Sequence, residues 1–187
     1  MSARARGAAP APKRRTLRPR PDHAAPRRVG CAILTVSDTR GRAEDRSGDL
    51  LQQRLERGGH AVVTRDWARD EVAAIRRALR AALSRADVDV VVLTGGTGVA
   101  PRDVTPEAVE PLVDRWLPGF GERFRMLSWQ QVGSAAWLSR AAAGVARGRL
   151  VVMLPGSPAA VRLAVDRLLV PELAHAARLL RRFETEG

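Results

Sequence analysis

Short runs of consecutive apolar residues alternate along the chain with longer segments in which apolar residues recur every three or four positions. The runs at 29–36, 60–64 and 88–94 are rich in Val, Ile and Leu, which is typical of strands buried on both faces of a parallel sheet. The longer segments between them have the spacing of amphipathic helices. This order predicts an α/β fold of three layers, in which helices cover both faces of a mostly parallel central sheet.

Polar residues and glycines mark where the predicted helices begin and end. A helix is expected over 47–57, where Gly58 and the glycine after it end the helix, and Asp70 is placed to cap a second, longer helix. The second half of the chain predicts a helix from Thr105, helical segments at 119–129 and 132–138, two strands within 140–154 that are parted by a turn at Arg147-Gly148, and a last helix that Ser157 caps and Pro158 begins.

A glycine-rich loop, Thr94–Gly98, begins where the strand at 88–94 should end. Its glycines can adopt positive φ and let backbone N–H groups approach an anion. Downstream, Thr105 is placed to cap a helix, so the loop faces a helix N-terminus, which favours phosphate. Between loop and helix lie Arg102 and Asp103, and a carboxylate beside a phosphate can hold Mg²⁺. The loop matches neither a Walker loop nor a dinucleotide fingerprint, and the glycines alone are also compatible with a tight turn.

A second strand-to-helix junction follows the apolar run at 150–154. There Pro155, Gly156 and Ser157 interrupt the chain before the last predicted helix. The carboxyl ends of parallel strands meet at one edge of a sheet. Two anion-receptive junctions could therefore face one crevice, and Ser37 and Asp38, at the end of the first strand, could line it as well.

Charge is distributed unevenly over the 187 residues. Residues 1–28 carry nine of the 32 Lys and Arg but one acid, so their net charge is +8, whereas residues 29–187 carry +4. The first segment is rich in Pro, Ala and Arg and poor in large apolar residues, which predicts a disordered basic tail, 1–28, before one folded domain, 29–187. Such a tail can attract nucleic acid through phosphates, but a solvated extension without a specific partner is the interpretation favoured here. No run is long enough to span a membrane, and we expect a cytoplasmic protein.

Cysteine and histidine offer little candidate chemistry. Cys31 is the chain's single cysteine, which excludes an internal disulfide, and it lies in a predicted buried strand. His23, His60 and His175 have no ligand spacing, so each is interpreted as a surface or packing residue.

Residues 95–108, Gly-Gly-Thr-Gly-Val-Ala-Pro-Arg-Asp-Val-Thr-Pro-Glu-Ala, resemble the signature of the MoaB/MogA family of molybdenum-cofactor biosynthesis proteins, which also includes domains of proteins such as gephyrin. Supporting segments in the same order are similar to family segments: they are 34–38, 118–122, 124–128, 138–141 and 154–157. The likeness covers about residues 29–180. The segments at 124–128 and 139–145 resemble the MoaB branch more than the MogA branch.

This resemblance implies an adenylyltransferase with Mg²⁺ as cofactor and ATP as co-substrate. The terminal phosphate of molybdopterin would attack the α-phosphate of ATP and release pyrophosphate. Such transfer depends mainly on positioning and charge neutralisation, which a glycine loop and carboxylates can supply without a His or Cys nucleophile. The alternative is a non-catalytic molybdopterin-binding or scaffold protein of the MoaB type.

The loop chemistry and the resemblance together assign the candidate site residues. Asp103 and Asp70 are the catalytic candidates, and Asp103 is also the Mg²⁺ ligand. The phosphate or nucleotide candidates are Gly95, Gly96, Thr97, Gly98, Ser37 and Asp38. The pterin candidates are Thr105, Ser139, Arg140, Pro155, Gly156 and Ser157, with Glu122 as a weaker one. Structural alternatives stay open, because Asp70 could only cap a helix, Asp38 could form an Asx turn and Asp103 could only close a turn.

The resemblance also implies partners. A homo-oligomer is expected, either a trimer or a hexamer, together with molybdopterin and ATP as ligands. Other proteins of the molybdenum-cofactor pathway could bind this chain, whereas neither a membrane nor nucleic acid is expected as a partner.

Overall fold

The computed structural model describes residues 28–38 and 44–181, and these residues form three layers around a mixed sheet. The described strands are β1 (Gly30–Val36), β2 (Ala61–Ala68), β3 (Val90–Thr94), β4 (Arg115–Trp116), β5 (Ala142–Ala146) and β6 (Arg149–Leu154). Their order is β2-β1-β3-β6-β5-β4. The first four strands of that order run parallel, whereas β5 is antiparallel to β6 and β4 is antiparallel to β5. The predicted mostly parallel α/β architecture is therefore confirmed.

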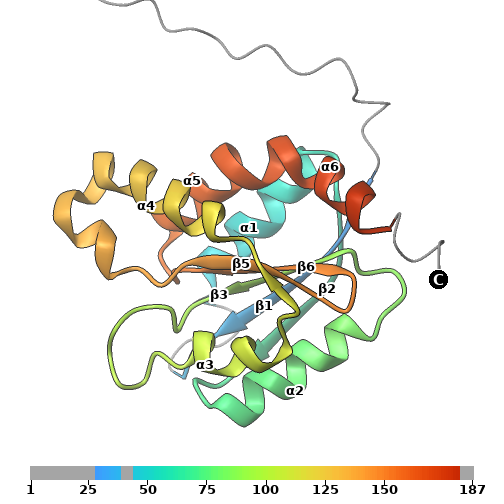
Figure 1. Cartoon of the computed structure of the whole chain (residues 1–187), viewed down its shortest axis with the longest axis horizontal. Coiled ribbons are helices and arrows are strands. Elements are labelled where there is room, and N and C mark those ends of the chain that lie inside the picture. Colours follow the sequence, from blue (N-terminus) through green and yellow to red (C-terminus); the bar gives the residue numbers. More distant parts are fainter. Residues whose placement is uncertain (1–27, 39–43, 182–187) are drawn as a thin grey trace, which may run out of the picture.

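Helices cover both faces of the sheet. They are α1 (Arg46–Arg57), α2 (Val72–Leu83), α3 (Thr105–Val109), α4 (Pro118–Val132), α5 (Pro158–Ala164) and α6 (Val170–Arg181), with short helical turns η2 (Glu110–Leu112), η3 (Gly133–Leu138) and η4 (Val165–Leu169). Figure 1 shows α1, α4, α5 and α6 on one side of the sheet and α2 and α3 on the other. A π-type turn, η4, joins α5 to α6 where the sequence predicted one last helix.

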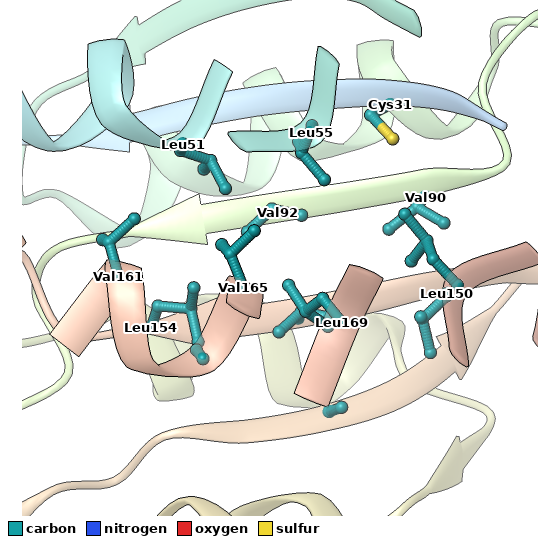
Figure 2. Close-up of a cluster of buried hydrophobic side chains, with 14 of the residues drawn as sticks. Cys31, Leu51, Leu55, Val90, Val92, Leu150, Leu154, Val161, Val165 and Leu169 are labelled. Carbon is teal, nitrogen blue, oxygen red and sulfur yellow. The ribbon is translucent and has the colours of Figure 1, made fainter. Parts of the chain in front are cut away.

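The core consists of two apolar clusters, one on each face of the sheet. Because successive side chains of a strand point to opposite faces, Val90 and Val92 of β3 pack in one cluster, and Val91 and Leu93 pack in the other. Figure 2 shows the first cluster, where Cys31 lies among side chains of α1, β3, β6 and the α5–η4 segment. Cys31 is fully buried, and burial, with a smaller contribution from Asp89, raises the pKa of its thiol to about 12.

Two strand predictions need correction. The strand expected at 60–64 continues to Ala68, because it is an edge strand whose Arg65 and Asp66 interrupt the apolar run without interrupting the pairing with β1. The two-residue strand β4 was not predicted at all. Both of its residues are exposed, so no local apolar pattern marks it, and it forms only through its pairing with Val145 and Gly144.

The helix starts show where local capping rules hold. Ser157 caps α5 as predicted, because its Oγ accepts a hydrogen bond of 3.2 Å from Ala160 N. The caps predicted at Asp70 and Thr105 are wrong. Glu71 is the N-cap of α2 and makes no side-chain capping bond, and Thr105 is itself the first residue of α3.

The basic tail predicted at residues 1–28 lies, except for Arg28, outside the described residues. In the part of the chain that the structure describes, none of the helices is long and apolar enough to cross a membrane.

Candidate functional site

A cavity of about 440 Å³ lies at the carboxyl edge of the parallel strands, where the segments after β1, β2, β3 and β6 converge. Such edges are the usual ligand sites of open α/β sheets. The cavity brings together ten of the candidate residues: they are Ser37, Asp38, Asp70, Gly95, Gly96, Thr97, Gly98, Asp103, Pro155 and Gly156. The two junctions that the sequence suggested thus face one crevice.

The backbone of the glycine loop requires glycine at two positions. Gly95 has φ +110° and Gly96 has φ +61°. A Cβ on Gly95 would lie 2.1 Å from Val36 O, and one on Gly96 would lie 2.5 Å from Thr105 Oγ1. The loop therefore packs against β1 and α3 at distances that exclude any side chain. Gly95 N donates to Leu154 O, so this N–H is not directed at a ligand as the sequence suggested.

Two buried polar atoms in the cavity wall have no hydrogen-bond partner among the described residues. They are Thr97 Oγ1 and Asp70 Oδ1. Thr97 is only 2% exposed. A buried polar group without a partner costs about 1–3 kcal/mol, and such groups in native proteins usually have a partner. Both atoms are consistent with a wall that a polar ligand completes.

Acidic side chains surround the glycine loop. Asp70 N donates to Asp38 Oδ1 at 3.1 Å, and Asp38 also forms an ion pair with Arg102. Burial raises the pKa of Asp70 above its ordinary value, and the neighbouring Asp38 and Asp103 raise it further, whereas Arg102 lowers it. The carboxylates thus lie close enough to repel one another, which makes the cavity attractive to a cation.

Asp103 closes a turn and also lines the cavity. Its Oδ2 accepts from Ala100 N at 2.9 Å, and Asp103 N donates to Ala100 O at 2.9 Å. The turn-closing alternative is therefore real, but it does not exclude a ligand role, since a carboxylate can accept several bonds. Among residues 28–38 and 44–181, no group of three or more His, Cys, Asp or Glu side chains is arranged to hold a metal ion by itself.

Sequence reasoning missed Asp45 and Ser47, which both line the cavity and are 2% exposed. Asp45 is the N-cap of α1: it accepts from Gly48 N at 2.8 Å, from Thr35 Oγ1 at 2.6 Å and from Arg65 Nη2 at 3.0 Å. Burial would raise the pKa of Asp45, but these hydrogen bonds and the charge of Arg65 outweigh it and hold the pKa below its ordinary value. The signal was an Asp three residues before Gly48 at a helix start.

Ser47 connects two of the segments that form the cavity. Its hydroxyl donates to Gly156 O at 2.7 Å. Gly156 in turn lies so close to the glycine loop that a Cβ on it would be 3.3 Å from Gly95 Cα. The start of α1, the loop after β6 and the loop after β3 therefore hold one another in place.

Several predicted pterin residues do not line the cavity, and two of them, Thr105 and Arg140, bond to the glycine loop instead. The Thr105 hydroxyl is fully buried and donates to Gly95 O at 2.9 Å. Arg140 N donates to Thr97 O at 2.9 Å and Arg140 Nε donates to Gly98 O at 2.8 Å. These contacts brace the loop carbonyls. Ser157 caps α5, as described above. The Ser139 hydroxyl accepts from Ala141 N at 3.3 Å, and Glu122 is exposed on α4.

The fold and the cavity define a class: three-layer α/β proteins with an acidic cavity at the carboxyl edge of the parallel strands of the sheet. Residues 32–175 match the model of the family described as "Probable molybdopterin binding domain". The chain therefore belongs to this molybdopterin-binding family, in its MoaB branch.

Two relatives carry the same name. Molybdenum cofactor biosynthesis protein B of Halalkalibacterium halodurans is 49% identical over 155 residues, which are 82% of this chain and 91% of that protein. The protein of the same name from Escherichia coli K12 is 44% identical over 142 residues, 76% of this chain and 84% of that one.

Solved structures agree with this assignment. A crystal structure of molybdenum cofactor biosynthesis protein B has a TM-score of 0.82 at 46% identity, over 85% of this chain and 99% of that chain. The tungsten cofactor synthesizing protein MoaB from Pyrococcus furiosus has a TM-score of 0.75 at 38% identity, over 84% and 99% of the two chains. These similarities confirm the resemblance seen in the sequence.

Proposed function

We propose that this chain catalyses the Mg²⁺- and ATP-dependent adenylylation of molybdopterin. Membership of the MoaB branch supports a role in molybdenum-cofactor biosynthesis. In the proposed step, an oxygen of the terminal phosphate of molybdopterin forms a bond to the α-phosphorus of ATP. The bond from that phosphorus to the bridging oxygen of the β-phosphate breaks, and pyrophosphate leaves with the electron pair.

The observation that carries the proposal is the junction of the glycine loop with Asp70 and Asp103 at one cavity. Phosphoryl-type transfer needs a rigid cradle and groups that neutralise charge, more than it needs a protein nucleophile. Thr97 Oγ1 offers a hydrogen bond that no described residue uses, and the positive φ of Gly95 and Gly96 lets the loop pack tightly against β1 and α3, which makes the cradle rigid. A cavity of about 440 Å³ lies within the range of small-molecule sites.

The residues of the cavity fit Mg²⁺. Mg²⁺ prefers carboxylate oxygens and is usually held by one or two of them together with substrate phosphates. Asp103 and Asp70 would hold it, and Asp70 has a buried oxygen that no described residue bonds. When bound, Mg²⁺ would supply neutralisation of phosphate charge. The absence of a three-ligand cluster among the described residues means that Mg²⁺ binding should depend on the nucleotide.

The other groups of the chain would orient the reactants. Arg140 holds the carbonyls of Thr97 and Gly98, so the loop keeps its shape while charge moves between phosphates. Ser47 fixes the Pro155-Gly156 segment, which lines the cavity beside the glycine loop. Positioning of this kind lowers the activation barrier, because the reacting groups are already oriented before the reaction begins.

The direct test mixes the purified chain with molybdopterin, ATP and Mg²⁺ and measures pyrophosphate release together with the adenylylated product. We expect both to appear, and omission of Mg²⁺ should stop both. Absence of both under conditions in which an active relative works would refute the proposal. If calorimetry then shows binding of molybdopterin but not of ATP, the chain is the non-catalytic binding protein instead.

The family resemblance also predicts the assembly. Light scattering on the purified chain is expected to give the mass of a trimer or a hexamer, and the mass of one chain would contradict this.

A further inference from the structure

Arg102 and Asp38 form an ion pair across two of the segments that line the cavity. Asp38 follows β1 and Arg102 follows β3, so 64 positions separate them in sequence. The Arg102 side chain is 76% exposed, whereas that of Asp38 is 22% exposed. The pair therefore lies where the cavity opens to solvent.

The two members of the pair are held very differently. Asp38 is anchored by a second bond, since its Oδ1 accepts from Asp70 N at 3.1 Å. For the Arg102 guanidinium, Asp38 is the sole partner that the described part of the chain provides. Arg102 is therefore the member that can move, and Asp38 is the fixed one.

The charges of the cavity wall suggest what the pair does when a ligand binds. Arg102 is the one basic side chain among the lining residues that the structure describes, and the same wall carries four carboxylates, those of Asp38, Asp45, Asp70 and Asp103. A ligand phosphate would be repelled by Asp38 and attracted by Arg102. A guanidinium fits a phosphate as well as a carboxylate, because its paired N–H donors match the oxygens of both.

We propose that Arg102 exchanges partners: Asp38 holds it while the cavity is empty, and a ligand phosphate displaces Asp38. Asp38 is then a competitor of the ligand and not one of the phosphate contacts that the sequence suggested. Because the pair is exposed and therefore weak, a ligand phosphate can displace Asp38, and a di- or triphosphate should do so best because it carries more negative charge. This inference rests on the proposed function in placing a phosphate ligand at this cavity.

The test is a double-mutant cycle on the binding of pyrophosphate, measured by calorimetry in a fixed excess of Mg²⁺. Arg102→Gln should weaken binding by about tenfold or more, because a charged hydrogen bond to the ligand is lost. Asp38→Asn, which keeps the acceptor for Asp70 N, should strengthen binding by up to about fivefold, the range of an exposed ion pair. In the Arg102→Gln background, Asp38→Asn should strengthen binding clearly less.

The Arg85–Asp87 pair supplies matched controls. It is an exposed ion pair away from the cavity, so Arg85→Gln and Asp87→Asn make the same chemical changes and should leave pyrophosphate binding unchanged. Equal effects of Asp38→Asn in both Arg102 backgrounds would mean that Asp38 acts only through its charge, and this would overturn the exchange. Weaker binding in Asp38→Asn, or no binding of pyrophosphate by the unaltered chain, would overturn it too.

Failure of the proposed function would look different. If the effects of the Arg102 and Asp38 substitutions on pyrophosphate binding are coupled but no adenylylated product forms, the partner exchange stands and the proposed adenylyltransferase activity is refuted. If product forms but the two substitutions act independently, the activity stands and the exchange is refuted.

Discussion

The Ser47 hydroxyl donates to the carbonyl of Gly156 at 2.7 Å, across 109 positions of sequence. Both residues line the cavity, and the bond joins the first turn of α1 to the loop after β6. Ser47 thus acts on the cavity by fixing its wall.

Ser47→Ala should lower the free energy of unfolding by about 1 kcal/mol, since a buried hydrogen bond is lost. We also expect a higher KM for the nucleotide or the pterin, because the Gly156 segment becomes less fixed. The matched control is Ser84→Ala, which removes a hydroxyl bonded to Arg80 O at the exposed end of α2. An unchanged KM in Ser47→Ala, measured alongside Ser84→Ala, would contradict the positioning role.

Gly96→Ala should destabilise the fold and impair the site. At φ +61° the added Cβ would be strained, and it would also lie 2.5 Å from Thr105 Oγ1 and 2.6 Å from Asp70 Oδ1. Gly59→Ala is the control, because Gly59 has φ +85° but nothing within 4 Å of the added Cβ. Urea unfolding should show a loss of about 1–2 kcal/mol for Gly59→Ala from strain alone, and a larger loss for Gly96→Ala. Equal losses would mean that the close packing of the loop contributes nothing.

Asp103→Asn should reduce product formation by about 100-fold or more while the chain stays folded, because the charge is lost but an acceptor for Ala100 N is kept. Molybdopterin binding should change little. Asp114→Asn serves as the control, since the Asp114 carboxylate also accepts from a backbone N–H, that of Arg147, but lies outside the cavity lining. If Asp103→Asn keeps its turnover, Asp103 has no part in the chemistry.

Stability should fall in mild acid because of His60. This side chain is 5% exposed, neither ring nitrogen has a partner among the described residues, and burial lowers the pKa of the imidazole from its ordinary 6.5. Below about pH 6.5 the unfolded chain binds a proton that the folded chain does not. The free energy of unfolding therefore decreases as the pH falls through this value, until the pH passes below the folded pKa.

The measurement is urea unfolding over a pH series. His60→Leu should flatten the part of the pH dependence that lies just below 6.5. His175→Leu, which removes an imidazole from α6, controls for the loss of a histidine as such. A slope that His60→Leu leaves unaltered would assign the effect to other groups.

The strands and turns whose formation depends on neighbouring residues could be predicted from the sequence. β1, β3 and β6 are apolar runs buried on both faces, and the turn between β5 and β6 follows from Gly148 at φ +72°. The prediction failed where distant contacts decide the outcome. Thr105 is a residue type that often caps helices, but its hydroxyl donates to Gly95 O instead. No pattern in the sequence around Thr105 predicts this bond.

Distant contacts also explain why only some of the cavity residues could be predicted. The glycine loop is a continuous segment and could be found from its composition, whereas Asp45 joins the site only because α1 packs beside β1 and β2. Its bond to Thr35 and its pairing with Arg65 cross from one element to another. Sequence patterns predict the main elements and the sheet edge that the two loops share, but they do not mark side-chain contacts between distant elements.

The reactivity of Cys31 toward a thiol reagent can report local unfolding around β1. It is the single cysteine of the sequence, it is fully buried in the cluster of Figure 2, and its pKa of about 12 leaves almost no reactive thiolate at neutral pH. A thiol reagent can therefore label the folded chain only when β1 separates from the helices above it. The labelling rate then measures how often this opening occurs, and no engineered probe is needed. A ligand that binds the folded cavity should slow the labelling in proportion to its occupancy.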